Sequence, residues 1–568
     1  MARAPKVGSR AHRCMGALCA VTAVLVAGLP AIGAAAPAPA GLALPLSLSW
    51  KYTATYDTNN PASPAVAGDT VYFACGSRVY ALDVESGALK WKFPQDQPLQ
   101  TRIRTTPAVM DDMLYFGADD GKLYALHTDT GKGTWLFDTR TSVGSTPTVA
   151  DGIVYFGAAD GHVYAIDTRT GAEVPSWKGG FQAQDEISGA PVVSNGLVFV
   201  ISLDQVLHAV GAATGKERFN VRLGGTVLRQ SPAVFGDYVY VAAGSRLSCF
   251  MARNLVPRWT QLLSTDITVA PAVDETGLYV VTAENTVMSF DLRTGKPKWK
   301  TLPRLDYDVL APPTLHNGLI FIGTVLGGVY ALDAATGETR WMYQTQPSTS
   351  VEDSIAKWTN VAASPVVAGG KLFVLSDDGS LAAFEANAAD TTPPDVTIVE
   401  PDMGVVINGV PPIHFEARIV DDGSGVNPAS IRMLIDGEGV VRRREGKEYE
   451  DDPGYYFDLR TATLDYDTPE PRTAALVKPL PDGRHTVSVV ASDWAGNTVT
   501  KTWSFTVDNS VAKLPRKQPQ GNQPGAGAFG GFGGRGGGIG GSGGRGGGIG
   551  GSGGRGGGPG GPGGRSDR

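Results

Sequence analysis

Twelve residues among the first 360 are the candidates for specific binding. Eight stand just before short apolar segments that recur along the chain: Arg102, Arg104, Glu186, Arg229, Gln230, Asp266, Asp306 and Asp308. Four lie in one longer insertion at residues 343–363: Glu352, Asp353, Trp358 and Asn360. Carboxylates and amides offer oxygen ligands, guanidinium groups bind anions, and an indole offers a stacking face. The chemistry of this set is therefore binding, although ordinary surface charge explains the same residues equally well.

No catalytic group can be assembled from these residues, because they belong to separate repeats and no Ser/His/Asp set or carboxylate pair stands out. The Asp-Gly pairs at Asp120, Asp160 and Asp378 have metal-ligand chemistry, but between alternating apolar runs they predict type I′ hairpin turns. The Thr-Gly pairs lack the lysine and the strand-to-helix context of a phosphate loop, so they also predict turns. We therefore predict no catalytic residue and no metal ligand.

The elements that position these residues come from a repeat, whose clearest copy is GGVYALDAATGETRW at residues 327–341. Each copy follows a proline, a turn and an alternating apolar run, as in TPAVMDDMLYFG from Thr106. Eight such prolines are spaced 39 to 52 residues apart, at positions 64, 107, 147, 191, 232, 271, 313 and 365. Four short strands per unit at this period are typical of a β-propeller, so we predict eight blades over residues 46–388.

The ends of the repeat region predict how the ring closes. The last unit stops near Ala388 without a tryptophan strand, and an unpaired copy of that strand, LSWKYTATYD, begins at Leu48. We expect the N-terminal strand to complete the eighth blade, which excludes an open solenoid with two bare ends.

One tryptophan recurs in almost every unit and predicts a structural role. We expect these side chains to pack the outer strand of each blade against its neighbour, with Phe219 in the one position that lacks the indole. The set is Trp50, Trp91, Trp135, Trp177, Trp259, Trp299 and Trp341.

The N-terminal 40 residues predict export. A basic stretch that ends at Arg13 is followed by an apolar run and by small residues with possible cleavage sites at Ala36 and Ala40. An uncleaved membrane anchor is the alternative, because the run is long enough to span a bilayer. The remaining cysteines, Cys75 and Cys249, fall in equivalent strands of the first and fifth units, and we expect two buried thiols.

The repeat resembles that of pyrroloquinoline-quinone (PQQ) propellers, in its A-L-D-x-x-T-G-x-x-x-W pattern with P-x-V and V-Y-x-G upstream. This resemblance covers about 340 residues and implies one of two functions. Quinoprotein alcohol dehydrogenases hold PQQ and calcium at the channel, whereas cofactor-free scaffolds such as the propeller lipoprotein of the outer-membrane β-barrel assembly machinery bind proteins. Because the chain lacks the adjacent cysteines of the dehydrogenases, and most of its units lack their long insertions, the resemblance favours the scaffold without a cofactor.

A different β pattern follows a Pro-rich linker at residues 389–394. Residues 395–508, notably DDGSGVNPASIRMLIDG from Asp421 and LPDGRHTVSVVASDWAGN from Leu480, resemble bacterial immunoglobulin-like domains, which implies a β-sandwich acting as a spacer or adhesive unit. Asp421, Asp422, Asn427, Asp493 and Asn497 could together offer calcium ligands, but turn chemistry explains them without a metal. The charged insert at residues 442–460 predicts a protruding hairpin or a partner-binding edge.

The tail at residues 511–568 has eight basic residues, one acidic residue and an RGGGIGGSGG-type repeat, so we expect it to be disordered. The whole chain has a net charge of −7, and because the tail is basic the body is strongly acidic, which argues against nucleic-acid binding. We predict an exported, monomeric, non-catalytic scaffold that binds a protein or an envelope polymer in the periplasm, at the cell surface or outside the cell. The alternatives are a PQQ- and calcium-dependent dehydrogenase and a structural surface protein without a discrete ligand.

Overall fold

The computed structural model describes residues 42–54, 62–227, 230–345, 359–387, 390–443, 453–469 and 478–513. Within these ranges the regular structure is β-strand apart from two short 3-10 turns, η1 (Pro175–Trp177) and η2 (Val325–Gly327). None of the described helical turns is long and apolar enough to cross a bilayer. The expected signal peptide, most of the insertion at 343–363 and the tail from residue 514 lie outside the described residues.

Eight small antiparallel sheets are formed by the described residues between 46 and 386. The first sheet contains β2 (Ala65–Ala67), β3 (Thr70–Cys75), β4 (Arg78–Asp83) and β5 (Leu89–Phe93), and the second contains β6 (Ala108–Met110), β7 (Met113–Gly117), β8 (Lys122–His127) and β9 (Gly133–Asp138). The third contains β10 (Thr148–Ala150), β11 (Ile153–Gly157), β12 (His162–Asp167) and β13 (Phe181–Gln182). The fourth contains β14 (Val192–Ser194), β15 (Leu197–Ser202), β16 (Val206–Gly211) and β17 (Glu217–Arg222). The next three contain β18 (Ala233–Phe235), β19 (Tyr238–Ala243), β20 (Arg246–Met251), β21 (Pro257–Leu262); β22 (Ala272–Val273), β23 (Leu278–Val281), β24 (Val287–Phe290); and β25 (Thr314–His316), β26 (Leu319–Gly323), β27 (Gly328–Asp333), β28 (Thr339–Gln344).

The eighth sheet joins the two ends of the repeat region. It contains β29 (Val366–Ala368), β30 (Lys371–Leu375), β31 (Ser380–Ala386) and the N-terminal strand β1 (Leu46–Thr53). Strand β1 runs antiparallel to β31, with Leu46 opposite Ala386 and Thr53 opposite Ser380. The last sheet is therefore completed by a segment more than 300 residues away in sequence.

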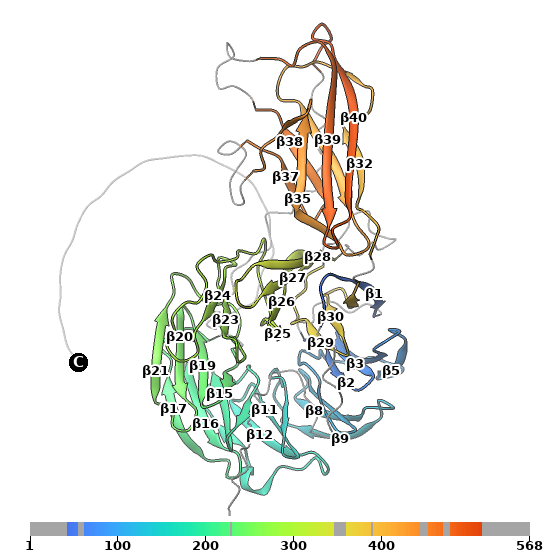
Figure 1. Cartoon of the computed structure of the whole chain (residues 1–568). Coiled ribbons are helices and arrows are strands. Elements are labelled where there is room, and N and C mark those ends of the chain that lie inside the picture. Colours follow the sequence, from blue (N-terminus) through green and yellow to red (C-terminus); the bar gives the residue numbers. More distant parts are fainter. Residues whose placement is uncertain are drawn as a thin grey trace, which may run out of the picture. The chain divides into compact units, whose positions relative to one another are not determined.

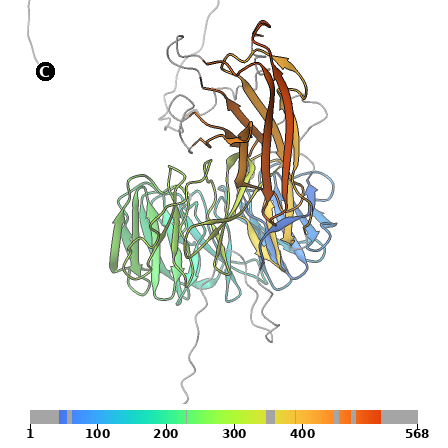
Figure 2. The ribbon, with the colours of Figure 1, turned by 45° about the horizontal axis from the view of Figure 1, so that its top comes forward.

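The sheets surround a common axis as in a β-propeller, and consecutive sheets are neighbours, as the colours show (Figure 1). Their first strands contact one another in a closed circular order, β2, β6, β10, β14, β18, β22, β25, β29 and back to β2. The later strands lie progressively farther out, so β21 and β17 mark the rim (Figure 1), and the turned view shows the green sheets standing side by side (Figure 2).

The hydrophobic core is divided among the spaces between adjacent sheets. One cluster, for example, joins Tyr72 and Trp91 of the first sheet to Leu114 and Phe116 of the second. Middle strands such as β3 are buried along their whole length because they face a neighbour on both sides, whereas the outer strand β17 is mostly exposed. For that reason the alternation of apolar and polar side chains is weak in the middle strands.

Each repeat tryptophan bonds to the next sheet through its indole N–H. The Nε1 atoms of Trp50, Trp91, Trp135, Trp177, Trp259 and Trp299 donate to carbonyl oxygens of Val84, Thr128, Thr168, Ala212, Leu292 and Ala334, at 2.6 to 3.3 Å. Each of these rings also covers the Thr-Gly or Ser-Gly turn of that next sheet. At the fourth sheet both partners of this pair change together, since Phe219 replaces the tryptophan and Leu255 takes the left-handed turn position, with φ 54°.

The turn glycines are required by this packing. A Cβ at Gly131, where φ is 63°, would lie 2.5 Å from Trp91 Cε3. We expect Gly131→Ala to lower the free energy of unfolding by about 2 kcal/mol, because it adds both backbone strain and a clash. Urea denaturation measures this loss. Gly133→Ala is the matched control, since its Cβ would have no neighbour closer than 3.9 Å; equal losses in the two variants would contradict the packing argument.

The type I′ prediction for the Asp-Gly pairs is wrong. Such turns need positive φ at both central residues, and the structure has this at Asp151-Gly152 but not at Asp120-Gly121, where only the glycine has positive φ. Asp120 instead uses its carboxylate, which accepts hydrogen bonds from Tyr124 Oη at 2.7 Å and from Lys122 N at 3.2 Å. These hydrogen bonds explain the acidic residue at this position without a metal ion.

Residues 395–507 form two sheets around one hydrophobic core, which we call the C-terminal domain. One sheet contains β32 (Asp395–Glu400), β34 (His414–Val420), β38 (Thr463–Asp467) and β37 (Tyr456–Asp458); the other contains β33 (Val406–Ile407), β40 (Thr498–Val507), β39 (Gly483–Asp493), β35 (Val426–Ile435) and β36 (Glu438–Gly439). Indole groups connect this domain to the seventh sheet: Trp494 Nε1 donates to Met342 O at 3.0 Å, and Trp341 Nε1 donates to Ser424 O at 3.1 Å.

A buried histidine makes the stability of the C-terminal domain depend on pH. His485 Nδ1 lies 2.6 Å from Asp436 Oδ2, and Nε2 lies 2.8 Å from Pro481 O, so both ring nitrogens face acceptors. Burial alone would lower the pKa of His485, but these hydrogen bonds outweigh burial and raise its pKa above the ordinary value of 6.5. The charged imidazole therefore contributes stability that is complete below about pH 6.5 and is lost as the pH rises through the folded-state pKa.

We expect His485→Gln to remove this pH dependence. The difference in melting temperature between wild type and His485→Gln should be largest near pH 5.5 and should shrink towards pH 8.5. Differential scanning calorimetry across this pH range measures the two melting temperatures. The contributions of the other histidines are the same in both proteins and cancel in the difference. A difference that is constant with pH would show that His485 is not charged in the fold.

Candidate functional site

The inner strands enclose a cavity of about 570 Å³ on the axis of the ring. Its wall comes from the residue that precedes the recurring proline of each repeat, together with the first strand that follows. These residues are Ser63, Thr106, Thr146, Ala190, Ser231, Ala270, Pro312 and Ser364. At these positions, where the eight segments converge on the axis, the wall is built mostly from small and hydroxyl side chains.

The hydroxyl groups of this wall bond from one sheet to the next. Ser364 N donates to Ser63 Oγ at 3.0 Å, Ser63 N donates to Thr106 Oγ1 at 3.0 Å, and Thr106 N donates to Thr146 Oγ1 at 3.2 Å. Farther round, Ala190 N donates to Ser231 Oγ at 2.8 Å. These hydroxyls satisfy backbone groups that would otherwise be exposed at the axis, so their first role is to hold neighbouring sheets together.

Charged groups also line the cavity. Arg104 binds Asp119 through Nε at 2.9 Å and Nη2 at 2.6 Å, and Ser142 Oγ donates to Asp119 Oδ1 at 2.9 Å. Glu186 and the exposed side chain of Leu310 complete this wall of mixed character. Such a surface suits a ligand that carries both polar and apolar groups.

Two of the predicted site residues, Arg104 and Glu186, line the cavity. Sequence reasoning missed Asp119 and Ser142. The signal for Asp119 was the contrast between GADDG at residues 117–121 and GAADG at 157–161, where Ala159 lines the same cavity. Because alanine occupies the equivalent position at residue 159, the fold does not require a charged side chain at residue 119.

The other predicted residues that the structure describes are not among those that line the cavity. Gln230 is buried, Arg102 is exposed, and Asp266 contributes its carbonyl oxygen to Ala283 N. Asp308 also contributes a carbonyl oxygen, to Val325 N at 2.8 Å. Arg229, Glu352, Asp353 and Trp358 lie outside the described residues.

Asp306 and Asn360 have internal partners. Asp306 accepts a hydrogen bond from Tyr330 Oη at 3.0 Å, and burial raises the pKa of its carboxyl group. Asn360 accepts from Leu326 N at 2.9 Å and donates to Asp377 Oδ2 at 2.7 Å. Leu326 has φ 62°, so Asn360 stabilises a strained turn.

A Ser-His-Glu cluster that the sequence did not indicate lies in the fourth sheet. His208 Nε2 is 3.1 Å from Ser202 Oγ, and His208 Nδ1 is 2.7 Å from Glu217 Oε1. Ser202, however, is fully buried and donates its own proton to Asp204. Its oxygen can then only accept from His208, which is the reverse of the direction that activates a nucleophile. The cluster therefore stabilises the sheet beside a polar cavity of about 290 Å³.

The predicted calcium residues are only partly together. Asp421 and Asp493 share a cluster with Asp390, with carboxylate oxygens within 4.8 Å of one another, whereas Asp422 does not belong to it. Asp493 accepts two hydrogen bonds from Asn497, and Asp421 accepts from Gly425 N at 2.7 Å. Burial, with the nearby carboxylates Asp390 and Asp493, raises the pKa of Asp421 to about 6. Turn contacts thus engage these oxygens, and calcium binding here stays an untested alternative to the turn chemistry that we predict.

The repeat, the ring of sheets and the axial cavity define a β-propeller of the PQQ-repeat class. The chain matches the family described as outer membrane protein assembly factor BamB at residues 76–178, 175–250 and 226–407, more than half of its length, and it belongs to this family.

Relatives within this class have different activities. The chain is 31% identical over 124 residues to outer membrane protein assembly factor BamB of Vibrio cholerae, covering 21% of this chain and 32% of that protein. It is 34% identical over 106 residues to quinohemoprotein alcohol dehydrogenase ADH-IIG of Pseudomonas putida, covering 17% of this chain and 14% of that protein. The chain thus spans about a third or less of these relatives. The computationally designed protein Ika8 has a similar fold, with a TM-score of 0.50 at 15% identity over 58% of this chain and 97% of that one.

Proposed function

We propose that this protein is an exported, non-catalytic, eight-bladed propeller scaffold that binds a polypeptide at the axial cavity. The proposal rests on the hydrogen bonds that the polar groups of this cavity already make. The hydroxyls bond neighbouring sheets, and the guanidinium of Arg104 is engaged by Asp119. Because these groups are already bonded, and Glu186 is the one further charged residue of the described wall, we infer that the cavity accepts a chain segment rather than catalysing a reaction.

The dehydrogenase alternative requires PQQ, a flat aromatic quinone with three carboxylates. Binding it calls for several cations and a stacking surface. Among the described residues of the cavity wall, Arg104 is the only Lys or Arg, it is paired with Asp119, and no side chain is aromatic. These residues do not fit the group, and we derive no reaction through it.

The remaining parts of the proposal concern location and organisation. The basic and apolar N-terminal 40 residues support export, and the relatives named outer membrane protein assembly factor support a protein partner in the cell envelope. The two sheets of residues 395–507 support an immunoglobulin-like domain that presents the propeller at a distance from an anchor. The basic tail supports attraction to an anionic envelope polymer.

Site-specific photo-crosslinking in the native envelope tests the binding site. Leu310 lines the cavity and is 55% exposed, whereas Leu136 on β9 is 54% exposed at the rim, so the two positions are matched. We expect a photo-reactive residue at position 310, and not at 136, to capture a protein. Equal adducts at both positions, or none at 310, would contradict the proposal.

Calorimetric titration of the protein with PQQ, with and without calcium, tests the alternative. We expect no heat of binding and no dye-linked alcohol oxidation. Calcium-dependent binding at micromolar Kd, about −8 kcal/mol, would overturn the non-catalytic assignment.

A further inference from the structure

The described wall of the axial cavity has a charged side and an apolar side. Its charged side chains are those of Arg104, Asp119 and Glu186, which belong to the second and fourth sheets and the segments that lead into them. The sixth and seventh sheets contribute Val273 and Leu310 together with several alanines and prolines. In the closed order of eight sheets, the second lies opposite the sixth and the third opposite the seventh. A ligand in the cavity therefore meets different chemistry on its two sides.

The charged side carries one carboxylate without a partner. Arg104 and Asp119 neutralise each other through the two hydrogen bonds between them, at 2.9 and 2.6 Å. The carboxylate of Glu186 forms no ion pair or hydrogen bond with any described residue, although its backbone is held in place. Glu186 N donates to Asp185 Oδ1 at 2.8 Å, and Glu186 O accepts from Leu203 N at 2.9 Å. One cation and two carboxylates leave this wall with a net negative charge, which attracts a cationic group.

The opposite side offers apolar contact. Leu310 takes the same repeat position as Arg104, three residues before the recurring proline, and its side chain is 55% exposed within the cavity. Burial of this side chain by a ligand is favourable, because it removes apolar surface from water. Pro271, Pro312 and Pro313 also line this side and have no backbone N–H to offer. Aliphatic groups of a ligand are therefore expected against this side.

We propose that the axial cavity selects a chain segment in which a lysine or arginine stands close to aliphatic residues. The basic group bonds to Glu186, and the aliphatic groups pack against Leu310 and Val273. This inference rests on the proposed binding of a polypeptide at the cavity and adds the chemistry of the partner. The volume of about 570 Å³ is typical of a small-ligand pocket, so a few residues enter rather than a folded domain. The net charge of −7 on the whole chain also favours the approach of a basic partner.

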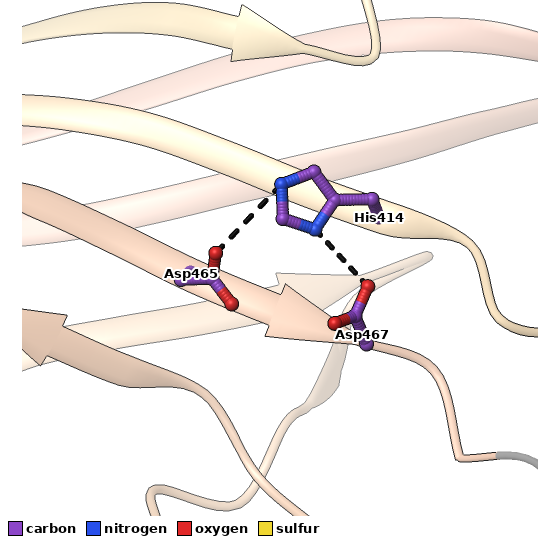
Figure 3. Close-up of side chains that lie close together, drawn as sticks. All are labelled: His414, Asp465 and Asp467. Carbon is purple, nitrogen blue, oxygen red and sulfur yellow. Dashed lines mark hydrogen bonds and ion pairs between the residues drawn. The ribbon is translucent and has the colours of Figure 1, made fainter. Parts of the chain in front are cut away.

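Two other carboxylates serve as controls for the charge of Glu186. In the C-terminal domain, Asp465 and Asp467 lie on either side of the His414 ring (Figure 3), and Asp465 Oδ2 is 3.7 Å from Nε2. Asp465→Asn removes one negative charge from the protein without a change in the cavity wall. Asp185→Asn removes a charge next to Glu186 and keeps an oxygen that can accept from Glu186 N. Neither Asp465 nor Asp185 lines the cavity.

Selection from a random library of acetylated pentapeptide amides on the immobilised full-length protein tests this specificity. We expect the retained peptides to be enriched in lysine or arginine together with leucine, isoleucine or valine. Glu186→Gln should abolish the enrichment of basic residues and keep that of aliphatic residues. Leu310→Ala should have the opposite effect, because it removes the apolar contact and leaves the carboxylate.

Fluorescence anisotropy with one enriched peptide then measures the contact itself. We expect Glu186→Gln to weaken binding about tenfold, as for the loss of a hydrogen bond between charged groups. Replacement of the basic residue of the peptide by norleucine should weaken binding by the same factor, and the two changes together should cost no more than either alone. Asp465→Asn and Asp185→Asn should leave the affinity unchanged.

The outcomes separate this inference from the proposed function. Enrichment without an excess of basic residues, or equal losses of affinity in Glu186→Gln and Asp465→Asn, would overturn the inference and leave polypeptide binding in place. A library without any enriched peptide would also overturn it, and the proposed function would fail with it if position 310 captures no protein. Circular dichroism checks the fold of each variant, and the norleucine peptide keeps the test available if Glu186→Gln does not fold.

Discussion

Replacing Trp341 by alanine should lower the free energy of unfolding by about 4 kcal/mol. Trp341 is fully buried, and its ring packs against Phe384 of the eighth sheet with centroids 5.7 Å apart. Its Nε1 lies 3.1 Å from both Leu46 O and Ser424 O. The side chain therefore connects the seventh sheet, the N-terminal strand and the C-terminal domain, and no other side chain of similar size could replace all three contacts.

Two further variants separate the contributions at this position. Trp341→Phe keeps most of the packing and removes the donor, so we expect it to cost about 1 kcal/mol. Phe219→Ala changes the same repeat position in the fourth sheet, where the side chain is 41% exposed, and should cost less than about 1 kcal/mol. Urea denaturation followed by circular dichroism measures all three. A loss for Trp341→Ala no larger than that for Phe219→Ala would contradict the proposed role.

Removal of the N-terminal strand should have the second large effect. A chain that begins at residue 58 lacks β1 and leaves the edge of β31 unpaired, whereas a chain that begins at residue 41 retains it. Leu42 and Leu46 are 6% and 0% exposed, and burial of each contributes about 1.5–3 kcal/mol. We expect the shorter chain to unfold at a much lower urea concentration and to associate through its exposed strand edge.

Addition of the missing strand as a separate peptide distinguishes ring closure from a general effect of truncation. A synthetic peptide of residues 41–57 should raise the unfolding midpoint of the shorter chain as its concentration increases, because it binds only the folded state. A chain that lacks residues 514–568 is the control, and we expect its midpoint to equal that of the parent. If the chain beginning at residue 58 is as stable and as monomeric as its parent, β1 does not close the ring.

Much of the architecture follows from the local pattern of the sequence. The spacing of the prolines, the alternating apolar runs and the Thr-Gly turns are short-range signals, and eight copies reinforce one another. The packing role of the tryptophans was also predictable, because a large ring that recurs at the same place in each unit needs the same kind of neighbour. Where Phe219 replaces the tryptophan, Leu255 replaces the turn glycine of the next sheet, as expected if the pattern reflects contacts between repeats.

The candidate sites were much less predictable. Arg104 and Glu186 reach the axial cavity, but Asp306, seven residues before its proline, accepts a hydrogen bond from Tyr330 instead. Distance along the chain from the proline does not give distance from the axis, because loops of different length fold back differently. Sequence patterns did not predict the cluster of Ser202, His208 and Glu217, because its members lie on three different strands.

Short-range patterns repeated along the chain therefore specify the repeated β unit, the class of fold and the residues that connect each unit to the next. Which ionisable groups meet depends on the three-dimensional fold. His414 and Asp465 are separated by about fifty residues, and Trp341 and Leu46 by 295, and they become neighbours through strand register and ring closure. Register is set by the burial of the alternate side chains across a whole sheet, a property that no short segment contains.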